Sequence, residues 1–361
     1  MPRKTWLEAL QVYAHPRVVA MLFLGFSAGL PFLLVFSTLT AWLTEDGLDK
    51  ATIGFFSWIG ITYSIKVLWA PVVDHLRLPG LQRLGQRRSW MLLAQTGIAV
   101  GLVLMSQIDP DRSLQAMAFA ALFVAFCSAT QDVAIDAYRI EAVVVEVQGA
   151  MSATYILGYR LALLMSGAGA FYIADFQSWP ISYRSMAGMV AVGIVTTLCI
   201  TEPINRRASE FTSVGQWLQH SVVDPFTDFF HRYASQAFVI LCLVGLYRLS
   251  DITMGVMANP FYLDLGFSKI EIANIGKVFG FAMSILGAAI GGMLVVRYGV
   301  YGPLLAGAIL VASTNLLFVT LNAVGADLTW LALVISADNL SGGLAGAAFI
   351  AYLSSLTSRS Y

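Results

Sequence analysis

The sequence predicts an all-α polytopic membrane protein, and three observations lead to this fold class. Hydrophobic residues make up 58% of the 361 residues, and the mean hydropathy is +0.74. Only 12% of the residues are charged, whereas soluble domains carry about 25%. About ten apolar stretches approach or exceed the roughly 20 residues that a helix needs to cross a bilayer.

The first apolar run indicates a retained helix and not a cleaved leader. It extends from Val18 to about Leu43, which is longer than the roughly 7–15 residues of a signal-peptide core. Further apolar runs follow along the whole chain. The ten predicted spans cover residues 19–43, 52–73, 89–108, 114–137, 150–174, 183–201, 236–258, 271–296, 302–322 and 329–353.

Lysine and arginine in the loops predict the orientation, because cytoplasmic loops are enriched in these residues. If the N-terminus is cytoplasmic, thirteen of them lie on the inner side and four on the outer side. We therefore expect both ends of the chain in the cytoplasm.

Two outer loops resemble each other and predict a duplication. Residues 47–53 and 266–272 share the pattern Gly-x-x-Lys-x-x-Ile, and an aromatic–Leu pair precedes each of them. Repeated halves are common among transporters, although two short turns can also be similar by chance. The expected organisation is an N-terminal six-helix bundle (1–201), a cytoplasmic amphipathic linker (202–232) and a C-terminal bundle with four helices (233–361). Because six helices precede the linker and four follow it, we expect a fragment that lacks at least two helices.

Charged residues inside the spans are the main functional signal. A charge at the bilayer centre costs about 3 kcal/mol on insertion scales, so such side chains should face a partner or a watery cavity. Apart from Arg184 at the very start of the sixth, the third, sixth and ninth spans carry none, which predicts that these helices lie on the outside of each bundle. The eight charged residues away from the span ends are Lys66, Asp132, Asp136, Arg160, Arg248, Asp251, Lys277 and Asp338.

The intramembrane cations predict an anionic substrate. Arg160 lies near mid-membrane, and its guanidinium suits a carboxylate or a phosphate. A structural ion pair with an aspartate of the fourth span is the alternative for Arg160, and snorkelling to the headgroups is the alternative for Lys66. Nearby tyrosines could stack on a sugar. The predicted substrate-binding residues are Arg160, Arg248, Tyr155, Tyr159 and Lys66.

Two intramembrane carboxylates are candidates for proton coupling. Burial raises the pKa of a carboxylate toward the physiological range, where it can carry a proton. Asp338, in the tenth span, is the first candidate, and Asp251 is the second. Asp251 and Arg248 share a helix face, so they can also simply neutralise each other. A hydrogen-bonded packing role is the alternative for Asp338.

Charges near the inner ends of the spans predict a gate. Asp132 and Asp136 lie one turn apart near the inner end of the fourth span, where a closing contact is favoured over a substrate site. Arginines in the loop between the second and third spans suggest a charge latch, although the positive-inside rule alone also explains them. The predicted gating residues are Asp74, Arg87, Arg88, Asp132, Asp136 and Arg139.

Several classes of chemistry find no support in the sequence. It has no Gly-rich phosphate loop, so an ATP-driven pump is not indicated. All four histidines lie outside the spans, and no cluster has metal-ligand spacing, so we expect neither a metal nor a cofactor. The net charge is zero and does not point to nucleic acid.

Several short segments of the first half form a distinctive set, namely GFSAGLP (25–31), TIGFF (52–56), KVLWAPVVD (66–74), GQRRSW (85–90), FCSATQD (126–132) with Asp136, and GYR (158–160). Together these segments resemble the AmpG-type muropeptide permeases, a branch of the major facilitator superfamily. Asp74 and Gly85-Gln86-Arg87-Arg88 also match parts of the superfamily signature Gly-x-x-x-Asp-Arg-x-Gly-Arg-Arg. The second half fits in helix pattern more than in motif.

The resemblance implies both a fold and a function. The fold would be two pseudo-symmetric six-helix bundles around a central cavity, with a long inner linker. The function would be that of a bacterial inner-membrane permease, a secondary active transporter that imports anhydro-muropeptides for cell-wall recycling and is driven by the proton gradient. The expected partners are an anionic glycopeptide, protons and the lipid bilayer.

Two other functions stay open at this point. A facilitator for another anionic solute, such as an acyl-coenzyme A or a sugar acid, would have the same helix pattern. An intramembrane transferase acting on a lipid-linked sugar would need a reactive cluster at one membrane face, and Asp132, Asp136 and Arg139 are the only candidate for that cluster. The mid-membrane charges and the repeat favour a transporter over an enzyme.

Overall fold

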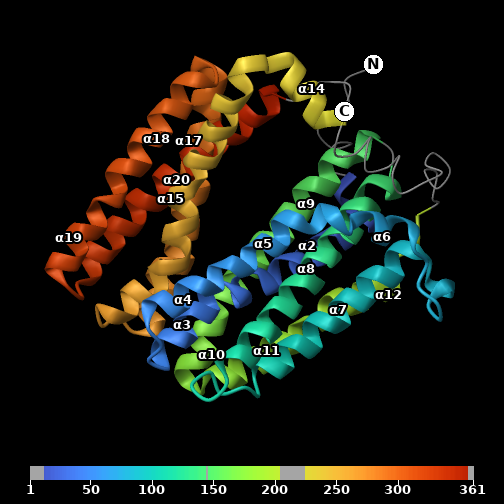
Figure 1. Ribbon diagram of the computed structural model, residues 1–361, viewed down its shortest axis with the longest axis horizontal. Helices are drawn as coiled ribbons and strands as arrows, with labels where there is room; N and C mark the ends of the chain where they lie inside the picture. Colours follow the sequence, from blue (N-terminus) through green and yellow to red (C-terminus); the bar gives the residue numbers. More distant parts are fainter. Residues whose placement is uncertain (1–11, 144, 204–223, 357–361) are drawn as a thin grey trace. The chain divides into compact units, whose positions relative to one another are not determined.

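Long apolar helices build the protein (Figure 1). The structure is a computed structural model that describes residues 12–143, 145–203 and 224–356. The chain divides into two compact units, residues 1–222 and 223–361. Because a bilayer core offers no water to backbone N–H and C=O groups, spanning segments must pair these groups internally, and helices do so.

The first unit contains six predicted spans, several of which consist of two or more consecutive helices. Its helices are α2 (Pro16–Val35), α3 (Ser37–Glu45), α4 (Lys50–Phe56), α5 (Ile61–Ser64), α6 (Ala70–His75), α7 (Gln86–Met105), α8 (Leu114–Ala142), α9 (Val145–Leu164), α10 (Ala170–Phe176), α11 (Trp179–Met189) and α12 (Ala191–Cys199). The first span joins α2 and α3, the fifth joins α9 and α10 through a π-helical turn, and the sixth joins α11 and α12.

The second unit begins with α14 and contains four predicted spans. Its helices are α14 (Asp224–Tyr233), α15 (Ala237–Asp264), α16 (Lys269–Glu271), α17 (Gly280–Tyr298), α18 (Tyr301–Asn315), α19 (Leu317–Val324) and α20 (Leu328–Leu356). A π-helical stretch, Ile272–Phe279, joins α16 to α17. Most of the predicted amphipathic linker, at 204–223, lies outside the described residues.

The helix lengths agree with a multi-pass membrane protein. Over the ranges that the structure describes, nine helices are long and apolar enough to cross a membrane, and a further apolar stretch, Ala237–Tyr247, lies in α15. The bounds of these nine helices agree with the predicted spans to within a few residues, because hydropathy identifies the apolar segment of each helix. α15 occupies the place of the seventh predicted span.

Glycines let the first and fifth spans approach each other closely. A Cβ at Gly25 would lie 2.2 Å from the carbonyl oxygen of Tyr155, and one at Gly158 would lie 1.8 Å from that of Leu22. No side chain fits between such backbones, so these glycines bring α2 against α9. The first span is interrupted at Phe36, between α2 and α3, five residues after Pro31. Glycine here serves close packing, which small residues permit in membranes.

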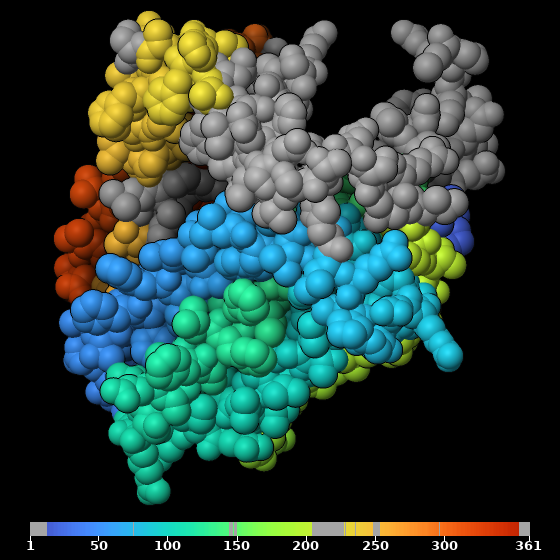
Figure 2. Space-filling model, turned by 45° about the vertical axis from the view of Figure 1, so that its right-hand side comes forward, coloured from blue at the N-terminus to red at the C-terminus, as the bar shows by residue number. Residues whose placement is uncertain are grey.

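The second span is irregular and partly exposed. Stretches of 3₁₀-helix, Ser57–Gly60 and Ile65–Leu68, interrupt it. Phe55 and Trp58 are 70% and 67% exposed, and Figure 2 shows this span, in blue, on the surface of the first unit. Short 3₁₀ stretches inside a helix often mark a hinge or local strain.

In the second unit, α17 and α20 pack backbone against backbone. A Cβ at Gly287 would lie 2.1 Å from the carbonyl oxygen of Leu340, and one at Gly343 would lie 2.3 Å from that of Ser284. The Gly-x3-Gly pattern of α17 therefore serves helix packing. In α20 the packing glycine is Gly343, whereas a Cβ at Gly342 would meet no atom within 4 Å among the described residues.

The two loops that suggested a duplication, predicted to lie on the outer side, have the same local structure. Gly47 and Gly266 both adopt positive φ, at +84° and +94°, which glycine tolerates and which ends a helix. The next amide of each loop reaches back to its helix, from Leu48 to the Leu43 carbonyl (3.1 Å) and from Phe267 to the Tyr262 carbonyl (3.1 Å). Leu43 therefore corresponds to Tyr262, and the aromatic–Leu pairs that preceded the motifs are one residue out of register.

Candidate functional site

An ion pair links the second and fourth spans of the first unit. The Nζ atom of Lys66 lies 3.6 Å from Oδ2 of Asp132, and the two side chains are 33% and 15% exposed. The other carboxylate oxygen, Oδ1, is buried and has no hydrogen-bond partner within the described part of the chain. Just beyond Lys66, the indole N–H of Trp69 donates to the hydroxyl of Thr130 (3.1 Å), which ties the same two spans together. A predicted substrate residue and a predicted gating residue thus meet.

Aromatic rings from three spans gather beside this pair. The ring of Phe32 in α2 lies 5.7 Å from that of Tyr63 in α5 and 6.5 Å from that of Tyr159 in α9. Tyr159 lies 6.2 Å from Tyr155, one turn earlier. The predicted sugar-stacking tyrosines therefore belong to a larger aromatic group that includes Phe32 and Tyr63. Such faces can stack on a sugar ring while the hydroxyls supply hydrogen bonds.

Arg139 makes a second ionic contact within α8 and a hydrogen bond to α9. The guanidinium of Arg139 lies 3.3 Å from Oδ1 of Asp136 and donates to the hydroxyl of Ser152 (2.6 Å). Asp132 and Asp136 thus have different cationic partners, Lys66 and Arg139. The Arg139–Asp136 contact spans one turn of α8, and the hydrogen bond to Ser152 holds the start of the fifth span against the fourth.

A buried network lies where α7 begins, at the predicted inner side. Arg87 is only 6% exposed. Its guanidinium contacts Asp74 at 2.6 Å and Glu141 at 2.6 Å. The carboxylate of Glu202 accepts hydrogen bonds from the backbone N–H groups of Arg87 (2.7 Å) and Arg88 (3.1 Å). A carboxylate at a helix N-terminus satisfies amides that the helix leaves unpaired.

Arg88 binds the end of another helix. Its side chain donates to the carbonyl oxygens of Thr197 (2.9 Å) and Leu198 (2.7 Å), in the last turn of α12. Arginine here satisfies carbonyls that the helix leaves unpaired. The two arginines that were predicted in a loop therefore lie in the first turn of α7, and their side chains connect this helix to Asp74 of α6, to α8 and to α12.

Two acidic residues of this network are not evident from the sequence. Glu141 and Glu202 stand at span ends, where solvated charges are common, and nothing in the sequence sets them apart. The one available signal is Gly85, which has φ of +90°. A Cβ there would lie 2.3 Å from Cγ of Glu202, so the glycine makes room for that side chain.

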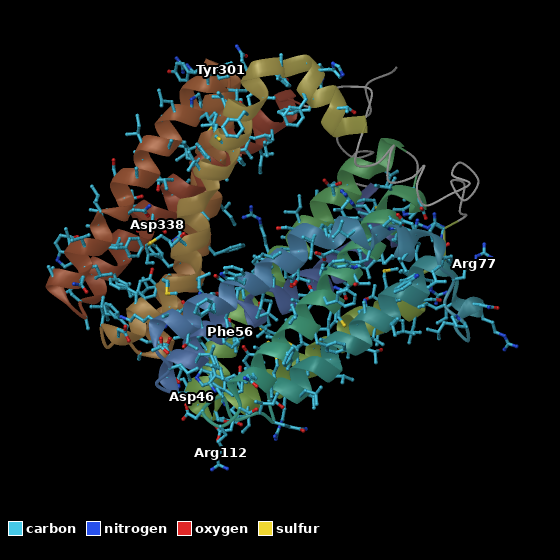
Figure 3. All side chains as sticks on the ribbon, in the orientation of Figure 1. Asp46, Phe56, Arg77, Arg112, Tyr301 and Asp338 are labelled. Carbon is cyan, nitrogen blue, oxygen red and sulfur yellow. The ribbon has the colours of Figure 1, made fainter. Side chains whose placement is uncertain are left out.

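Asp338 lines a polar pocket inside the second unit. The pocket has a volume of about 230 Å³, and its lining includes Tyr262, Asn315 and Asn339. Ser284 of α17 donates to Oδ1 of Asn339 (2.8 Å). Figure 3 shows Asp338 between the two ends of the second unit's helices. A carboxylate in this position can exchange a proton with water in the pocket.

The remaining predicted site residues are placed only in part. Arg160 follows Tyr159 on α9 and lies ten residues after the start of its span. Arg248 and Asp251 lie on α15, but their side chains are outside the described residues. Over 12–143, 145–203 and 224–356, no group of three or more His, Cys, Asp or Glu side chains could hold a metal ion.

Comparisons with known proteins reveal the family. The sequence model of the Major Facilitator Superfamily matches residues 21–361. The chain belongs to the Major Facilitator Superfamily. This membership confirms the predicted fold class and the prediction of a transporter in place of an enzyme, so the transferase alternative is wrong.

Full-length relatives place the chain within this superfamily. It is 35% identical over 356 residues to the anhydromuropeptide permease of Escherichia coli K12, which covers 98% of this chain and 70% of that protein. It is 33% identical over 358 residues to putative transporter AmpG 4 of Rickettsia conorii, with coverage of 98% and 86%. The predicted resemblance to AmpG-type permeases is therefore confirmed.

Solved structures of superfamily transporters share the fold. The nucleoside transporter NupG superposes with a TM-score of 0.67 at 16% identity, over 95% of this chain and 83% of that chain. A D-xylose–proton symporter superposes with a TM-score of 0.58 at 12% identity, over 96% and 88%. At these identities the likeness concerns the fold alone.

Proposed function

We propose that this superfamily member is a proton-coupled permease that imports anhydro-muropeptides for cell-wall recycling. The observation that carries the proposal is the 35% identity, over 98% of this chain, to a protein named anhydromuropeptide permease. The chemistry of the first unit supports it independently. A muropeptide joins sugars to a peptide with free carboxylates, and the site offers aromatic faces beside a cation.

The substrate site would centre on the aromatic group and Lys66. Tyr155 and Tyr159, which lie 6.2 Å apart, would stack on the sugars. Lys66, one-third exposed beside Asp132, would exchange its partner for a substrate carboxylate. Arg160 and Arg248 would bind further carboxylates, because a guanidinium fork matches that group.

Proton coupling would depend on the second unit. Asp338 in its 230 Å³ pocket is the proposed proton carrier, with Asp251 as the second candidate. Ionising a carboxylate in a site shielded from bulk water changes the local electrostatic field. Such a change can shift the equilibrium between the two conformations of a transporter. Neutral Asp338 would therefore favour one state and ionised Asp338 the other.

The inner networks would form the gate. Breaking the Asp74–Arg87–Glu141 contacts would leave three charged groups without their partners. The closed arrangement would therefore persist until substrate or proton binding offsets the free energy needed to separate these charges. Arg88, Asp132, Asp136 and Arg139 would move with it, because they tie α7, α8, α9 and α12 together. The gate residues are thus Asp74, Arg87, Arg88, Asp132, Asp136 and Arg139.

The proposed location is the bacterial inner membrane, with the N-terminus in the cytoplasm. The loop charges support this orientation, since thirteen lysines and arginines would face inward and four outward. Figure 3 places Arg77 at one end of the first unit, and Asp46 and Arg112 at the opposite end. The gate network would then lie at the cytoplasmic end, with Arg77.

Uptake into proteoliposomes tests the function. Labelled anhydro-muropeptide should accumulate when the pH is lower outside, and a protonophore should abolish the accumulation. Uptake that a protonophore leaves unchanged would refute proton coupling. Stronger competition by an acyl-coenzyme A or a sugar acid than by unlabelled anhydro-muropeptide would favour the facilitator alternative.

Two sets of variants test the residues. Asp338→Asn should lose gradient-driven accumulation but keep exchange of internal for external substrate, whereas Asp109→Asn, in an exposed outer-loop ion pair with Arg112, should behave as wild type. Equal effects of the two variants would contradict the assignment of Asp338. Normal uptake by both Arg160→Ala and Arg248→Ala would refute the anion-site assignment.

A further inference from the structure

A groove runs along the first unit between α2 and α12. It has a volume of about 730 Å³, within the range of about 300–1,000 Å³ that small-molecule sites occupy. Its walls are almost wholly apolar. Val19 and Phe23 of α2 and Val195 of α12 line it, and they are 42%, 43% and 57% exposed. An apolar, elongated site on a membrane-spanning bundle suits an acyl chain.

One end of the groove is polar. Arg17, Tyr138 and Thr201 line it there. The guanidinium of Arg17 donates to the carbonyl of Ala142 and to the hydroxyl of Thr201 (3.3 Å). A guanidinium carries five N–H donors in a fixed fork, so beyond these two hydrogen bonds Arg17 can still offer donors to an anion.

Tyr138 gives an independent indication of a ligand. Its side chain is 0% exposed, and within the described ranges its hydroxyl has no hydrogen-bond partner. A buried hydroxyl without a partner costs roughly 1–3 kcal/mol of desolvation. Because Tyr138 lines the same groove as Arg17, an acceptor bound at the polar end would satisfy this hydroxyl.

We propose that this groove binds an anionic phospholipid, with its acyl chain between α2 and α12 and its phosphate on Arg17, Tyr138 and Thr201. The three side chains donate to phosphate oxygens, and the charge of Arg17 complements the charge of the headgroup. Glu202, the nearby carboxylate, accepts hydrogen bonds from the amides at the start of α7 and so is already stabilised there. Arg17 lies at the predicted cytoplasmic side, where anionic lipids attract basic residues.

Binding at this groove would connect lipid composition to the gate. Thr201 directly precedes Glu202, which caps α7, and Arg88 binds the last turn of α12. The lipid would therefore contact the same helix end that the latch uses. This site is separate from the substrate cluster and does not depend on the proposed substrate.

The test compares lipid-dependent stability of purified protein. Added phosphatidylglycerol should raise the melting temperature of wild type, and phosphatidylcholine should not. Tyr138→Phe should weaken the apparent affinity for phosphatidylglycerol about tenfold, because it removes a hydrogen bond to a charged group. Without added lipid, the same variant should be at least as stable as wild type, since it removes an unsatisfied buried hydroxyl.

Two further variants separate headgroup from chain. Arg17→Gln should weaken phosphatidylglycerol binding, whereas Arg112→Gln, an exposed arginine outside the spans, should not. Val195→Trp should fill the groove and block the chain, whereas Val319→Trp, at a 66% exposed position of α19, should leave binding intact. Equal stabilisation by the two lipids, or unchanged phosphatidylglycerol affinity in both Tyr138→Phe and Val195→Trp, would overturn the proposal.

Discussion

The two units share the structure of one turn, at Gly47 and at Gly266, but differ in the contacts of the helices that follow it. Gly47 and Gly266 end a helix in the same way, and Asp49 and Ser268 then cap the next one. Below the turns the units diverge. In the first unit the second span meets α8 through an ion pair at Lys66, whereas in the second unit α17 meets α20 through glycine at Gly287.

The helices after the turns are also distorted in opposite senses. The second span of the first unit contains 3₁₀ stretches, which are wound more tightly than an α-helix, while its counterpart contains the looser π-helical stretch Ile272–Phe279. The two turns thus have the same structure, whereas the spans that follow them differ. The second span of the first unit contacts α8 through an ion pair, and the corresponding helix of the second unit contacts α20 through close backbone packing.

The largest expected difference in stability lies between a variant of Arg87 in the first unit and a variant of Arg297 in the second. Arg87→Met should destabilise the protein by about 3–5 kcal/mol, because it leaves the largely buried Glu141 and the partly buried Asp74 without their cation. Arg297→Met, in the last turn of α17, should have little effect, since Arg297 is exposed and contacts the Tyr298 ring at 5.4 Å. Thermal unfolding in detergent measures both, and equal losses would contradict the contrast.

The next effect concerns the ion pair between spans. Lys66→Met should cost roughly 2–3 kcal/mol, less than a fully buried pair because Lys66 is one-third exposed. Lys66→Met combined with Asp132→Leu should recover most of this stability, since no lone charge remains. The same unfolding assay applies. A double variant no more stable than Lys66→Met would show that the pair is not coupled.

In the second unit, steric overlap and not the loss of a charge should weaken the equivalent contact between α17 and α20. Gly287→Ala should cost about 1–3 kcal/mol, because its Cβ must displace the Leu340 carbonyl. Gly292→Ala on the same helix is the control, as its Cβ meets no described atom within 4 Å. Similar melting temperatures for the two variants would mean that α17 and α20 do not pack this closely.

The smallest effects distinguish the two caps. Ser268→Ala should cost about 0.5–1 kcal/mol, since Ser268 accepts from the Glu271 amide. Hydrogen bonds from Thr52 lower the pKa of Asp49, so its capping contribution is present above its unfolded-state pKa and is lost as pH falls through the folded-state pKa. The difference between Asp49→Ala and wild type should therefore vanish in acid, while that of Ser268→Ala should persist. A pH series of melting curves compares them.

Hydropathy predicts the spans well because the bilayer imposes one length and one composition on each of them. Contacts between spans are harder to predict. Lys66 and Asp132 are each conspicuous, but their pairing depends on how two helices rotate, which one sequence does not specify. Gly25 and Gly29 suggest a kink when read alone, whereas the structure uses them to bring α2 against α9.

The substrate cluster is most directly tested by binding to a folded variant that lacks it. Purified wild type should bind labelled anhydro-muropeptide saturably, and the Lys66→Met/Asp132→Leu double variant should lose that binding while unfolding at nearly the same temperature. Loss of binding without loss of fold is the predicted result. Equal affinity in the two proteins would contradict a substrate site built around Lys66 and the neighbouring tyrosines.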